Sequence, residues 1–301
     1  MDQSRIVVAG SSGLIGAALV RSLVADGHEV VRLVRRAPRA ADEVRWDPDG
    51  GEVAAAVLAG CDAVVNLAGA NVGARRWTEA YKESLRRGRV RGTGALASAM
   101  AALKPGERPR VFVNGSAIGY YGETGEEIVD ESSPPGEGFL PELCVEWEAA
   151  AAPAREAGVR TVFLRTGLVV AREGGAWGRL FPLFKAGLGG RLGDGRQFWS
   201  FVSLHDEVAA IRFLLDAEQL SGPFNVTAPE PVTNREITAA MGRVLHRPTL
   251  FQVPAPVLRT VLGEMAGDVL GSQRVVPARL LESGFTFAFP DVEGAIRAAL
   301  G

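Results

Sequence analysis

The stretch "VVAGSSGLIG" at residues 7–16 decides the fold of this 301-residue chain. An apolar, β-branched run enters a loop that contains Gly10, Gly13 and Gly16, and the segment 14–27 follows with helical apolar spacing that ends at Gly27. A glycine-rich loop between a strand and a helix is the context of a dinucleotide-binding fingerprint. The same three glycines can also form a bare strand-to-helix turn, so the rest of the sequence has to decide.

The first half of the chain repeats this strand–helix alternation. Val-rich apolar runs predict buried strands at 5–10, 28–36, 61–70, 110–117 and 160–170, and helical spacing lies at 14–27, 78–103 and 141–157. Strands of this kind separated by helices favour a parallel sheet that is covered on both faces. We therefore predict an α/β fold with a Rossmann-like, doubly wound parallel sheet.

The second half is less regular. Residues 171–198 are rich in glycine and turn signals, and a helix at 205–217, a strand at 222–227 and a helix at 233–245 follow. We predict a nucleotide-binding domain over 1–170, to which 199–227 returns. Residues 171–301 would mainly form a small C-terminal substrate subdomain.

Composition narrows the function classes. The net charge of −2 provides no general basic field for nucleic acid, and no apolar run is long enough to span a membrane. The N-terminus has no secretory pattern, so we expect a cytoplasmic protein. Two cysteines fit a reducing compartment, and the three histidines are too scattered to predict a metal site. The expected partner is a small-molecule substrate.

If the loop binds a dinucleotide, each of its three glycines has a different structural role. Gly10 would allow the tight turn, Gly13 would let the backbone approach a pyrophosphate, and Gly16 would let the helix pack closely. The helix N-terminus offers unpaired N–H groups to the phosphates. About 20 residues further on, where NAD-binding proteins carry an acid, this chain has Arg35 and Arg36. A guanidinium pairs with a 2′-phosphate, which predicts NADP instead of NAD.

Further motifs support a family resemblance. They are "VVNLAGANV" (64–72), "GYYG" (119–122), "CVEWEAAA" (144–151), "LRTGLVV" (164–170), "LFKAGLGGRLGDGRQFWSFV" (183–202) and "QRVVPARLLESGFTFAFPD" (273–291). With "GSSGLIG" (10–16), they make the chain resemble the extended short-chain dehydrogenase/reductases. More narrowly, it resembles the atypical, sugar-nucleotide epimerase-like branch whose members end in a C-terminal domain of unknown function.

The resemblance implies a bound NADP(H) and assigns residues to it. The pyrophosphate would be lined by Gly10, Ser12, Gly13, Leu14 and Ile15. Arg35 would lie at the 2′-phosphate, and the segment Leu67, Ala68 and Gly69 would pass under the adenosine and ribose. Three further positions are implied. Arg89 would point toward the cofactor or lie on a solvated helix face, and Ser116 is where the superfamily keeps a catalytic Ser or Thr. Val169 would lie on the nicotinamide side.

The acid–base pair of the superfamily is missing. Its working members carry Tyr-x-x-x-Lys on one helix face, where the lysine lowers the pKa of the tyrosine. At the corresponding helix Cys144 replaces the tyrosine and Glu148 replaces the lysine. A carboxylate beside a thiol raises the pKa of that thiol, so the usual mechanism cannot be transferred.

Three hypotheses follow for the chemistry. Tyr120 or Tyr121, just after Ser116, could carry the proton, although aromatic residues there often only pack a loop. Glu148 or Cys144 could act, although a lone cysteine is more often a buried hydrophobe. Without catalysis, the chain would be an NADP(H)-binding regulatory or scaffold protein.

Other residues have weaker signals. Asp206 is expected to cap the helix it opens, and His205 could face a pocket or simply pack. Trp199 and Phe201 could line a pocket or belong to the core, and the arginines Arg165 and Arg191 are candidate anion anchors. The "RRW" motif at 75–77 has no assigned physical role.

Overall fold

The computed structural model describes residues 3–50 and 53–301. Its centre is a seven-stranded parallel sheet in the order β12-β7-β5-β4-β1-β2-β3. The strands are β1 (Arg5–Ala9), β2 (Glu29–Val34), β3 (Glu43–Arg45), β4 (Ala63–Asn66), β5 (Val111–Ala117), β7 (Arg160–Thr166) and β12 (Gly222–Val226). The predicted Rossmann-like α/β class is confirmed.

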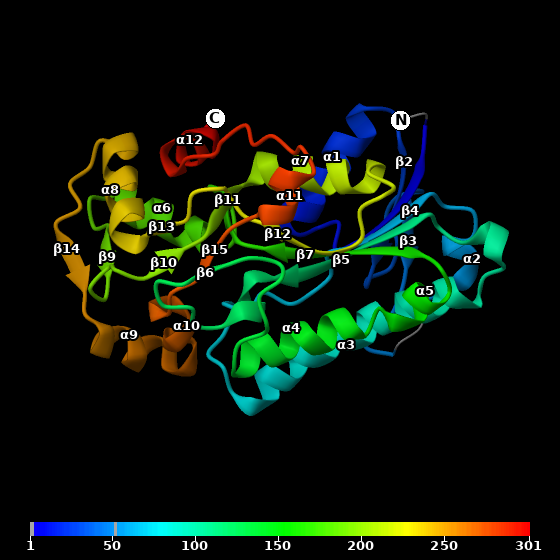
Figure 1. Cartoon of the computed structure of the whole chain (residues 1–301), viewed down its shortest axis with the longest axis horizontal. Helices are drawn as coiled ribbons and strands as arrows, with labels where there is room; N and C mark the ends of the chain where they lie inside the picture. Colours follow the sequence, from blue (N-terminus) through cyan, green and yellow to red (C-terminus); the bar gives the residue numbers. More distant parts are fainter. Residues whose placement is uncertain (1–2, 51–52) are drawn as a thin grey trace.

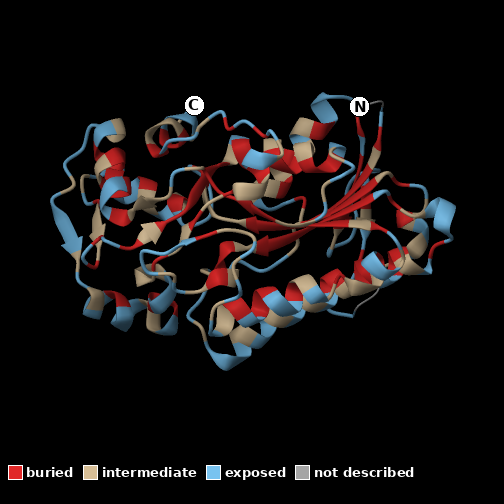
Figure 2. Ribbon diagram, in the orientation of Figure 1, coloured by how far each residue is buried: buried red, intermediate tan, exposed pale blue. Residues whose placement is uncertain are grey.

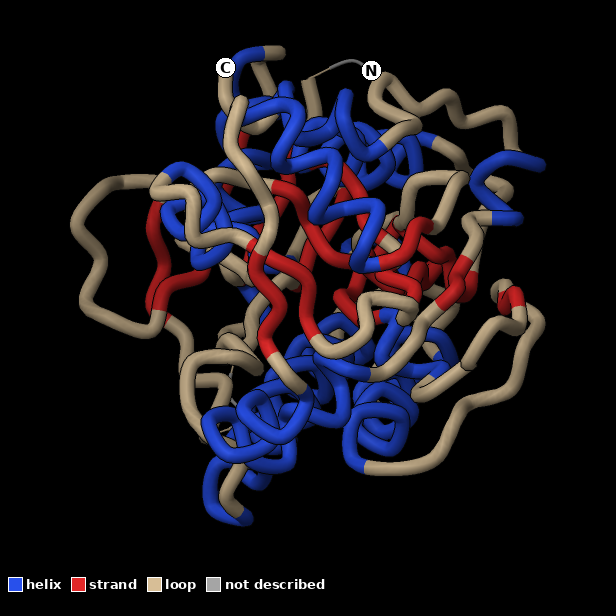
Figure 3. The backbone as a smooth tube through the Cα atoms, turned by 90° about the vertical axis from the view of Figure 1, so that its left-hand side faces the viewer, coloured by secondary structure: helices blue, strands red, loops and turns tan. Residues whose placement is uncertain are grey.

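Helices cover both faces of the sheet (Figure 3). One face carries α1 (Leu14–Ala25), α7 (Leu204–Asp216) and α11 (Ala278–Glu282); the other carries α2 (Ala55–Leu58), α3 (Glu79–Ala102), α4 (Phe139–Ala149) and α5 (Ala152–Glu156). The strands alternate between two apolar cores, so that Val8 and Val65 pack with α1 and α7, whereas Val7 and Val64 pack with α3 and α5. Figure 2 shows the resulting band of buried strands.

The strand order has a topological switch point between β1 and β4, where successive strands begin to be added on the other side of β1. Strands β2 and β3 extend the sheet to one side of β1, and β4, β5, β7 and β12 extend it to the other. In open α/β sheets, ligands bind outside the carboxyl ends of the strands at such a switch point. Gly10 directly follows β1 and Leu67 directly follows β4, so both residues lie at this point.

A smaller unit lies to the left of the sheet in Figure 1. Its core packs Trp177, Phe181, Trp199 and Phe201 together, which places the last two in the core. The remaining strands and α-helices outside the main sheet are β6 (Ile128–Val129), β8 (Leu168–Val170), α6 (Trp177–Lys185), β9 (Gly190–Leu192), β10 (Phe198–Trp199), β11 (Phe201–Ser203), β13 (Val232–Thr233), α8 (Asn234–Leu245), β14 (Phe251–Val253), α9 (Ala255–Leu262), α10 (Ala266–Leu270), β15 (Arg274–Val275) and α12 (Val292–Ala298).

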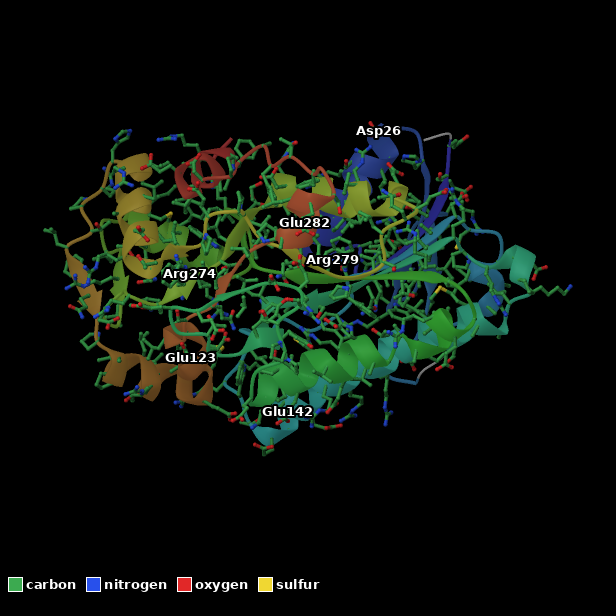
Figure 4. The ribbon with its side chains drawn as sticks, viewed as in Figure 1. Asp26, Glu123, Glu142, Arg274, Arg279 and Glu282 are labelled. Carbon is green, nitrogen blue, oxygen red and sulfur yellow. The ribbon has the colours of Figure 1, made fainter. Side chains whose placement is uncertain are left out.

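The C-terminal segment is fastened to the sheet. Arg279 on α11 (labelled in Figure 4) donates hydrogen bonds to the carbonyls of Pro223 and Ser221 at the start of β12.

The prediction that Asp206 caps α7 is wrong, because the residue at the cap is Ser203. The Asp206 carboxylate instead accepts hydrogen bonds from the Ser203 hydroxyl and from the backbone N–H groups of residues 288 and 289. In the described part of the chain, no helix is long and apolar enough to cross a membrane.

Candidate functional site: the glycine loop and the polar group around Glu148

In the glycine loop, backbone segments lie so close together that two positions have no room for a side chain. Gly10 has a φ of +80°, and a Cβ atom there would lie 2.5 Å from the backbone of Leu67. A Cβ atom on Gly16 would lie 2.2 Å from the Gly10 carbonyl oxygen. The first turn of α1 is therefore pressed against the loop that precedes it, and side chains at these two positions would force the strand, loop and helix apart.

The N-terminus of α1 is open to a ligand. Among the described residues, no side chain accepts a hydrogen bond at the Gly13 cap, and the first turn contains no acid. Ser12 and Gly13 are exposed at the switch point. The first N–H groups of the helix, with the positive end of its dipole, therefore face solvent where an anionic group could accept their hydrogen bonds.

The two arginines after β2 have different surroundings. Arg36 donates two hydrogen bonds of 2.7 Å to the Glu43 carboxylate, which also accepts one from the backbone of Arg39. The Arg36 guanidinium holds the pKa of Glu43 at about 2. Arg35 is exposed, and its side chain has no ion-pair or hydrogen-bond partner among residues 3–50 and 53–301. Arg35 is thus free to meet a ligand, whereas Arg36 is engaged within the protein.

Beyond β4, the segment Leu67–Gly69 lies against the glycine loop. The N–H of Leu67 donates to the Ala9 carbonyl, and that of Ala68 donates to the Asn66 side chain, so the segment stays close to the glycine loop. Gly69 is exposed on one side and lies against the Arg89 guanidinium, whose Cζ would be 3.2 Å from a Cβ at Gly69. Arg89 is buried, not on a solvated helix face.

A buried polar cluster sets the position of α4. The Asn66 side-chain amide donates to the Thr93 hydroxyl of α3 at 3.0 Å and to Oδ1 of the Asn114 side chain on β5 at 2.7 Å. The Trp147 indole N–H donates to the Thr93 hydroxyl at 2.9 Å. These bonds join β4, β5, α3 and α4, and they fix the turn of α4 that carries Glu148.

Ser116, Glu148 and Arg165 form one hydrogen-bonded group. The Ser116 hydroxyl at the end of β5 donates to Glu148 Oε1 at 2.7 Å. Arg165 on the neighbouring β7 donates to both carboxylate oxygens, from Nε at 2.9 Å and from Nη2 at 3.0 Å. The Arg165 side chain is 4% exposed and that of Glu148 is 13% exposed. Glu148 is therefore part of a largely buried ion pair, and Arg165 is committed to it.

Both tyrosines after Ser116 surround Arg165. The Tyr120 ring lies under the guanidinium, with 3.4 Å from Cζ to the ring centroid. The Tyr121 hydroxyl accepts a hydrogen bond from Arg165 at 3.0 Å and donates to Asn225 of β12 at 2.7 Å. Burial raises the pKa of Tyr121 to about 12. Tyr121 therefore keeps its proton near neutral pH, and the two rings help to enclose the arginine.

Cys144 lies one helical turn before Glu148 and is buried. Burial, with the Glu148 carboxylate as a second cause, raises the pKa of its thiol to about 12, while Arg89 opposes this rise. Its sulfur lies 3.8 Å from the Ala117 carbonyl oxygen. The thiol is therefore protonated at neutral pH and has the character of a small apolar side chain.

Several other candidates lie away from this group. Val169 packs against the core beneath α7, and Arg191 donates to the Gln252 side chain in the smaller unit. His205 lines a groove of about 1130 Å³ that runs from the glycine loop along α1 and α7 to the C-terminus. No cluster of three metal-ligating side chains occurs in the described part of the chain.

The "RRW" motif ties the loop after β4 to neighbouring segments. The Trp77 ring packs edge-on against Phe139 of α4, and Arg76 donates to the Thr260 carbonyl of α9 at 2.6 Å. The motif therefore joins the loop after β4 to α4 and to α9.

Sequence reasoning missed the buried carboxyl of Glu207. Thr166 donates to its Oε1 at 2.9 Å, and Oε2 has no partner in the described part of the protein. Burial raises the pKa of Glu207 to about 8. The signal was helical spacing, because Glu207, Ile211 and Leu214 occupy one buried face of α7.

The fold and the loop define a class: a Rossmann-like α/β protein with a glycine loop at the switch point of its sheet and a smaller C-terminal unit. Residues 6–227 match the NAD dependent epimerase/dehydratase family, and residues 253–299 match a domain of unknown function, DUF1731. The chain belongs to this epimerase family and carries that C-terminal domain, as the resemblance predicted.

Named relatives cover nearly the whole chain. An epimerase family protein of Mycobacterium leprae is 46% identical over 283 residues, which is 94% of this chain and 91% of the relative. Human epimerase family protein SDR39U1 is 36% identical over 297 residues, 97% of this chain and 98% of the relative. The crystal structure of human SDR39U1 isoform 2 with NADPH superposes with a TM-score of 0.90 at 33% identity, covering 99% of each chain.

Proposed function

We propose that this protein binds NADP(H) at the glycine loop and is an oxidoreductase or epimerase-like enzyme for a small substrate. The observation that carries the proposal is the open N-terminus of α1 at the switch point, next to Arg35, which follows the neighbouring strand and has no side-chain partner in the described part of the protein. The NADPH in the structure of the human relative supports the same choice of cofactor. Two buried free thiols are consistent with a reducing compartment such as the cytoplasm.

The residues present fit the cofactor. Ser12–Ile15 would line the pyrophosphate, whose oxygens would accept hydrogen bonds from N–H groups other than that of Gly13, which already donates to the Gly10 carbonyl. Arg35 would pair with the 2′-phosphate, and Leu67–Gly69 would line the adenosine side. Gly10 and Gly16 contribute by allowing the close packing that leaves this cradle free of side chains. When bound, the nicotinamide supplies hydride transfer, and the protein supplies binding and orientation.

The acid–base role falls to the Ser116–Glu148 pair. The Ser116 hydroxyl already donates to Glu148, so a substrate hydroxyl that donates to Ser116 would complete a path by which a proton reaches the carboxylate. Arg165 fixes the orientation of the carboxylate through two hydrogen bonds. Cys144 and Tyr121 are poorer candidates, because the pKa values of both lie near 12.

The test is a substrate screen across alcohols, ketones and nucleotide-sugars, followed by nicotinamide absorbance. We expect turnover that Glu148→Gln and Ser116→Ala reduce by roughly a hundredfold or more while NADPH affinity stays within about twofold. A substrate that both variants turn over normally would contradict the assigned proton path. Tight NADPH binding without any turnover would instead favour the second function.

That second function is an NADP(H)-binding regulatory or scaffold protein without catalysis. Its supporting observation is that the replaced tyrosine position holds a buried, protonated thiol, and the replaced lysine position holds a carboxylate committed to Arg165. A regulator needs a partner whose affinity differs between the free and the NADP(H)-bound protein. A pull-down with and without NADPH tests this, and identical partner sets would remove its support.

A further inference from the structure

The groove of about 1130 Å³ that begins at the glycine loop has walls from two separate parts of the chain. Ser12 and Gly13 line it at the start of α1, and Arg172 lines it from the segment between β8 and α6. A Cβ atom at Gly174 in this segment would lie 3.8 Å from the Leu14 side chain, which is an ordinary contact distance. The segment between β8 and α6 therefore lies against the first turn of α1, where the proposed function places the pyrophosphate.

This segment is anchored at both ends and exposed between them. Val170 at the end of β8 and Trp177 at the start of α6 are each 1% exposed, whereas residues 172–176 are exposed. Gly174 and Gly175 have φ values of +94° and +60°, which glycine adopts without steric cost. The buried anchors thus fix the position of the segment beside α1, and its exposed residues remain available to a ligand.

Three arginines are among the described residues that line this groove, and they differ in their surroundings. Arg212 on α7 forms an ion pair with Asp26. Arg21 lies roughly 12 Å along the axis of α1 from its Gly13 cap, at 1.5 Å per residue. Arg172 is exposed, and its side chain has no ion-pair or hydrogen-bond partner among residues 3–50 and 53–301. Arg172 is therefore the guanidinium that an anion at the first turn of α1 would meet.

The acids that line the groove leave this end of it without a neutralising ion pair. Asp216 is the last residue of α7, so a whole helix separates it from Ser203 at the opposite end. Glu173 is exposed next to Arg172, but the two side chains form no ion pair in the described part of the protein. The first turn of α1 contains no acid. The positive end of the α1 dipole and Arg172 thus act on the same region.

We propose that Arg172 is a second cofactor-binding arginine, which pairs with the pyrophosphate from the side opposite α1. This inference rests on the proposed NADP(H) site and adds a residue to it. A guanidinium donates two charge-assisted hydrogen bonds to phosphate oxygens, which the helix N–H groups would bind from the other side. Arg172 and Arg35 then have separate tasks. Arg35 acts on the 2′-phosphate that NADH lacks, whereas Arg172 acts on the pyrophosphate that NADPH and NADH share.

The test is a titration of wild type and of each variant with NADPH and with NADH, followed by nicotinamide fluorescence. We expect Arg172→Gln to weaken the binding of both nucleotides by the same factor, roughly tenfold, so that the preference for NADPH persists. Arg172→Lys keeps the positive charge and should recover most of the affinity. The matched control is Glu173→Gln, which removes a negative charge from the adjacent exposed position and should leave both affinities unchanged or slightly higher.

The outcomes separate this inference from the proposed function. If Arg172→Gln binds both nucleotides as wild type does, or loses affinity for NADPH alone, Arg172 does not act on the pyrophosphate and the inference is wrong. The inference also fails if Glu173→Gln loses as much affinity as Arg172→Gln, because the conformation of the segment would then be the cause. In each of these cases the proposed NADP(H) site stands. If the folded wild-type protein binds neither nucleotide, the proposed function fails as well. Circular dichroism confirms that each variant is folded.

Discussion

Arg165 donates two hydrogen bonds to the Glu148 carboxylate, one of 2.9 Å from Nε to Oε1 and one of 3.0 Å from Nη2 to Oε2. From the resemblance we predicted that Glu148 takes the place of the superfamily lysine on α4. Ser116 adds a third donor to the same carboxylate, and Tyr120 and Tyr121 enclose the guanidinium. This part of the protein therefore holds a fixed pair of opposite charges beside a serine.

Breaking one side of this pair should destabilise the fold. Arg165→Met leaves the Glu148 carboxylate uncompensated and is expected to lower the free energy of unfolding by about 3 kcal/mol or more. The double variant Arg165→Met/Glu148→Gln removes both charges and should regain at least about 1 kcal/mol of that loss. Urea denaturation of the four proteins in the cycle measures the coupling. Simple additivity of the two single changes would show that the pair contributes no coupling.

Neither thiol should react while the protein is folded. Burial raises the pKa values of both Cys61 and Cys144 to about 12, so the reactive thiolate is scarce and also inaccessible. Titration with a chromogenic disulfide reagent at pH 8 should detect no fast-reacting thiol in native protein and both thiols after unfolding in guanidinium chloride. Rapid native reaction at Cys144 would restore it as a nucleophile candidate.

Replacing Gly10 by alanine should lower the free energy of unfolding far more than the same change at Gly27, which has a similar backbone conformation. Gly10 and Gly27 have φ values of +80° and +84°, but only a Cβ at Gly10 would collide with backbone, whereas nothing lies within 4 Å at Gly27. We expect Gly27→Ala to cost roughly 1 kcal/mol of unfolding free energy through strain alone, and Gly10→Ala to cost clearly more. Thermal denaturation compares them. Equal losses would mean that the loop relaxes around the new methyl group.

The main sheet was largely predictable because its strands are continuous apolar runs. The run at 160–170 is the informative exception, because the structure divides it at Gly167 into β7, which pairs with β12, and β8, which pairs with β11. Glycine fits at this break, where a Cβ would lie 2.7 Å from the Ser200 carbonyl oxygen. Strand β3 escaped prediction because three residues are too few to show a period. Helix α6 was hidden by the surrounding glycines and by Pro182 inside it.

Within the site, motif positions were easier to predict than side-chain partners. The glycines follow from local backbone geometry, which a short stretch of sequence encodes. By contrast, Arg36 meets Glu43, and Arg165 meets Glu148, only because the sheet brings separate segments together. No spacing rule reveals such tertiary pairs. The Tyr121–Asn225 hydrogen bond, which joins residues 104 positions apart, is equally invisible in one sequence.

The free energy of unfolding should fall as the pH rises, in part because the buried Glu207 carboxyl loses its proton. Its pKa is raised to about 8 in the fold, against 4.5 for an ordinary glutamate, so the folded state binds the proton more tightly than the unfolded state does. The resulting stabilisation is complete below about pH 4.5 and is lost as the pH rises through 8.

Glu207→Gln should remove this part of the pH dependence, because glutamine stays neutral and can still accept the Thr166 hydrogen bond. Relative to wild type, the variant should gain on the order of 1 kcal/mol or more in unfolding free energy between pH 5.5 and pH 8.5, measured by urea denaturation. Parallel pH profiles for the two proteins would contradict the prediction.

The central claim is that the glycine loop and Arg35 bind the phosphates of NADP(H), and a titration with NADPH and NADH followed by nicotinamide fluorescence tests it most directly. We predict saturable binding of NADPH, weaker binding of NADH, and a loss of roughly ten- to a hundredfold in NADPH affinity for Arg35→Gln with little change for NADH. Arg36→Gln is the matched control and should leave the NADPH to NADH preference in place, since Arg36 is engaged by Glu43. No binding of either nucleotide to the folded wild-type protein, or an Arg35→Gln variant that keeps its full preference for NADPH, would contradict the account.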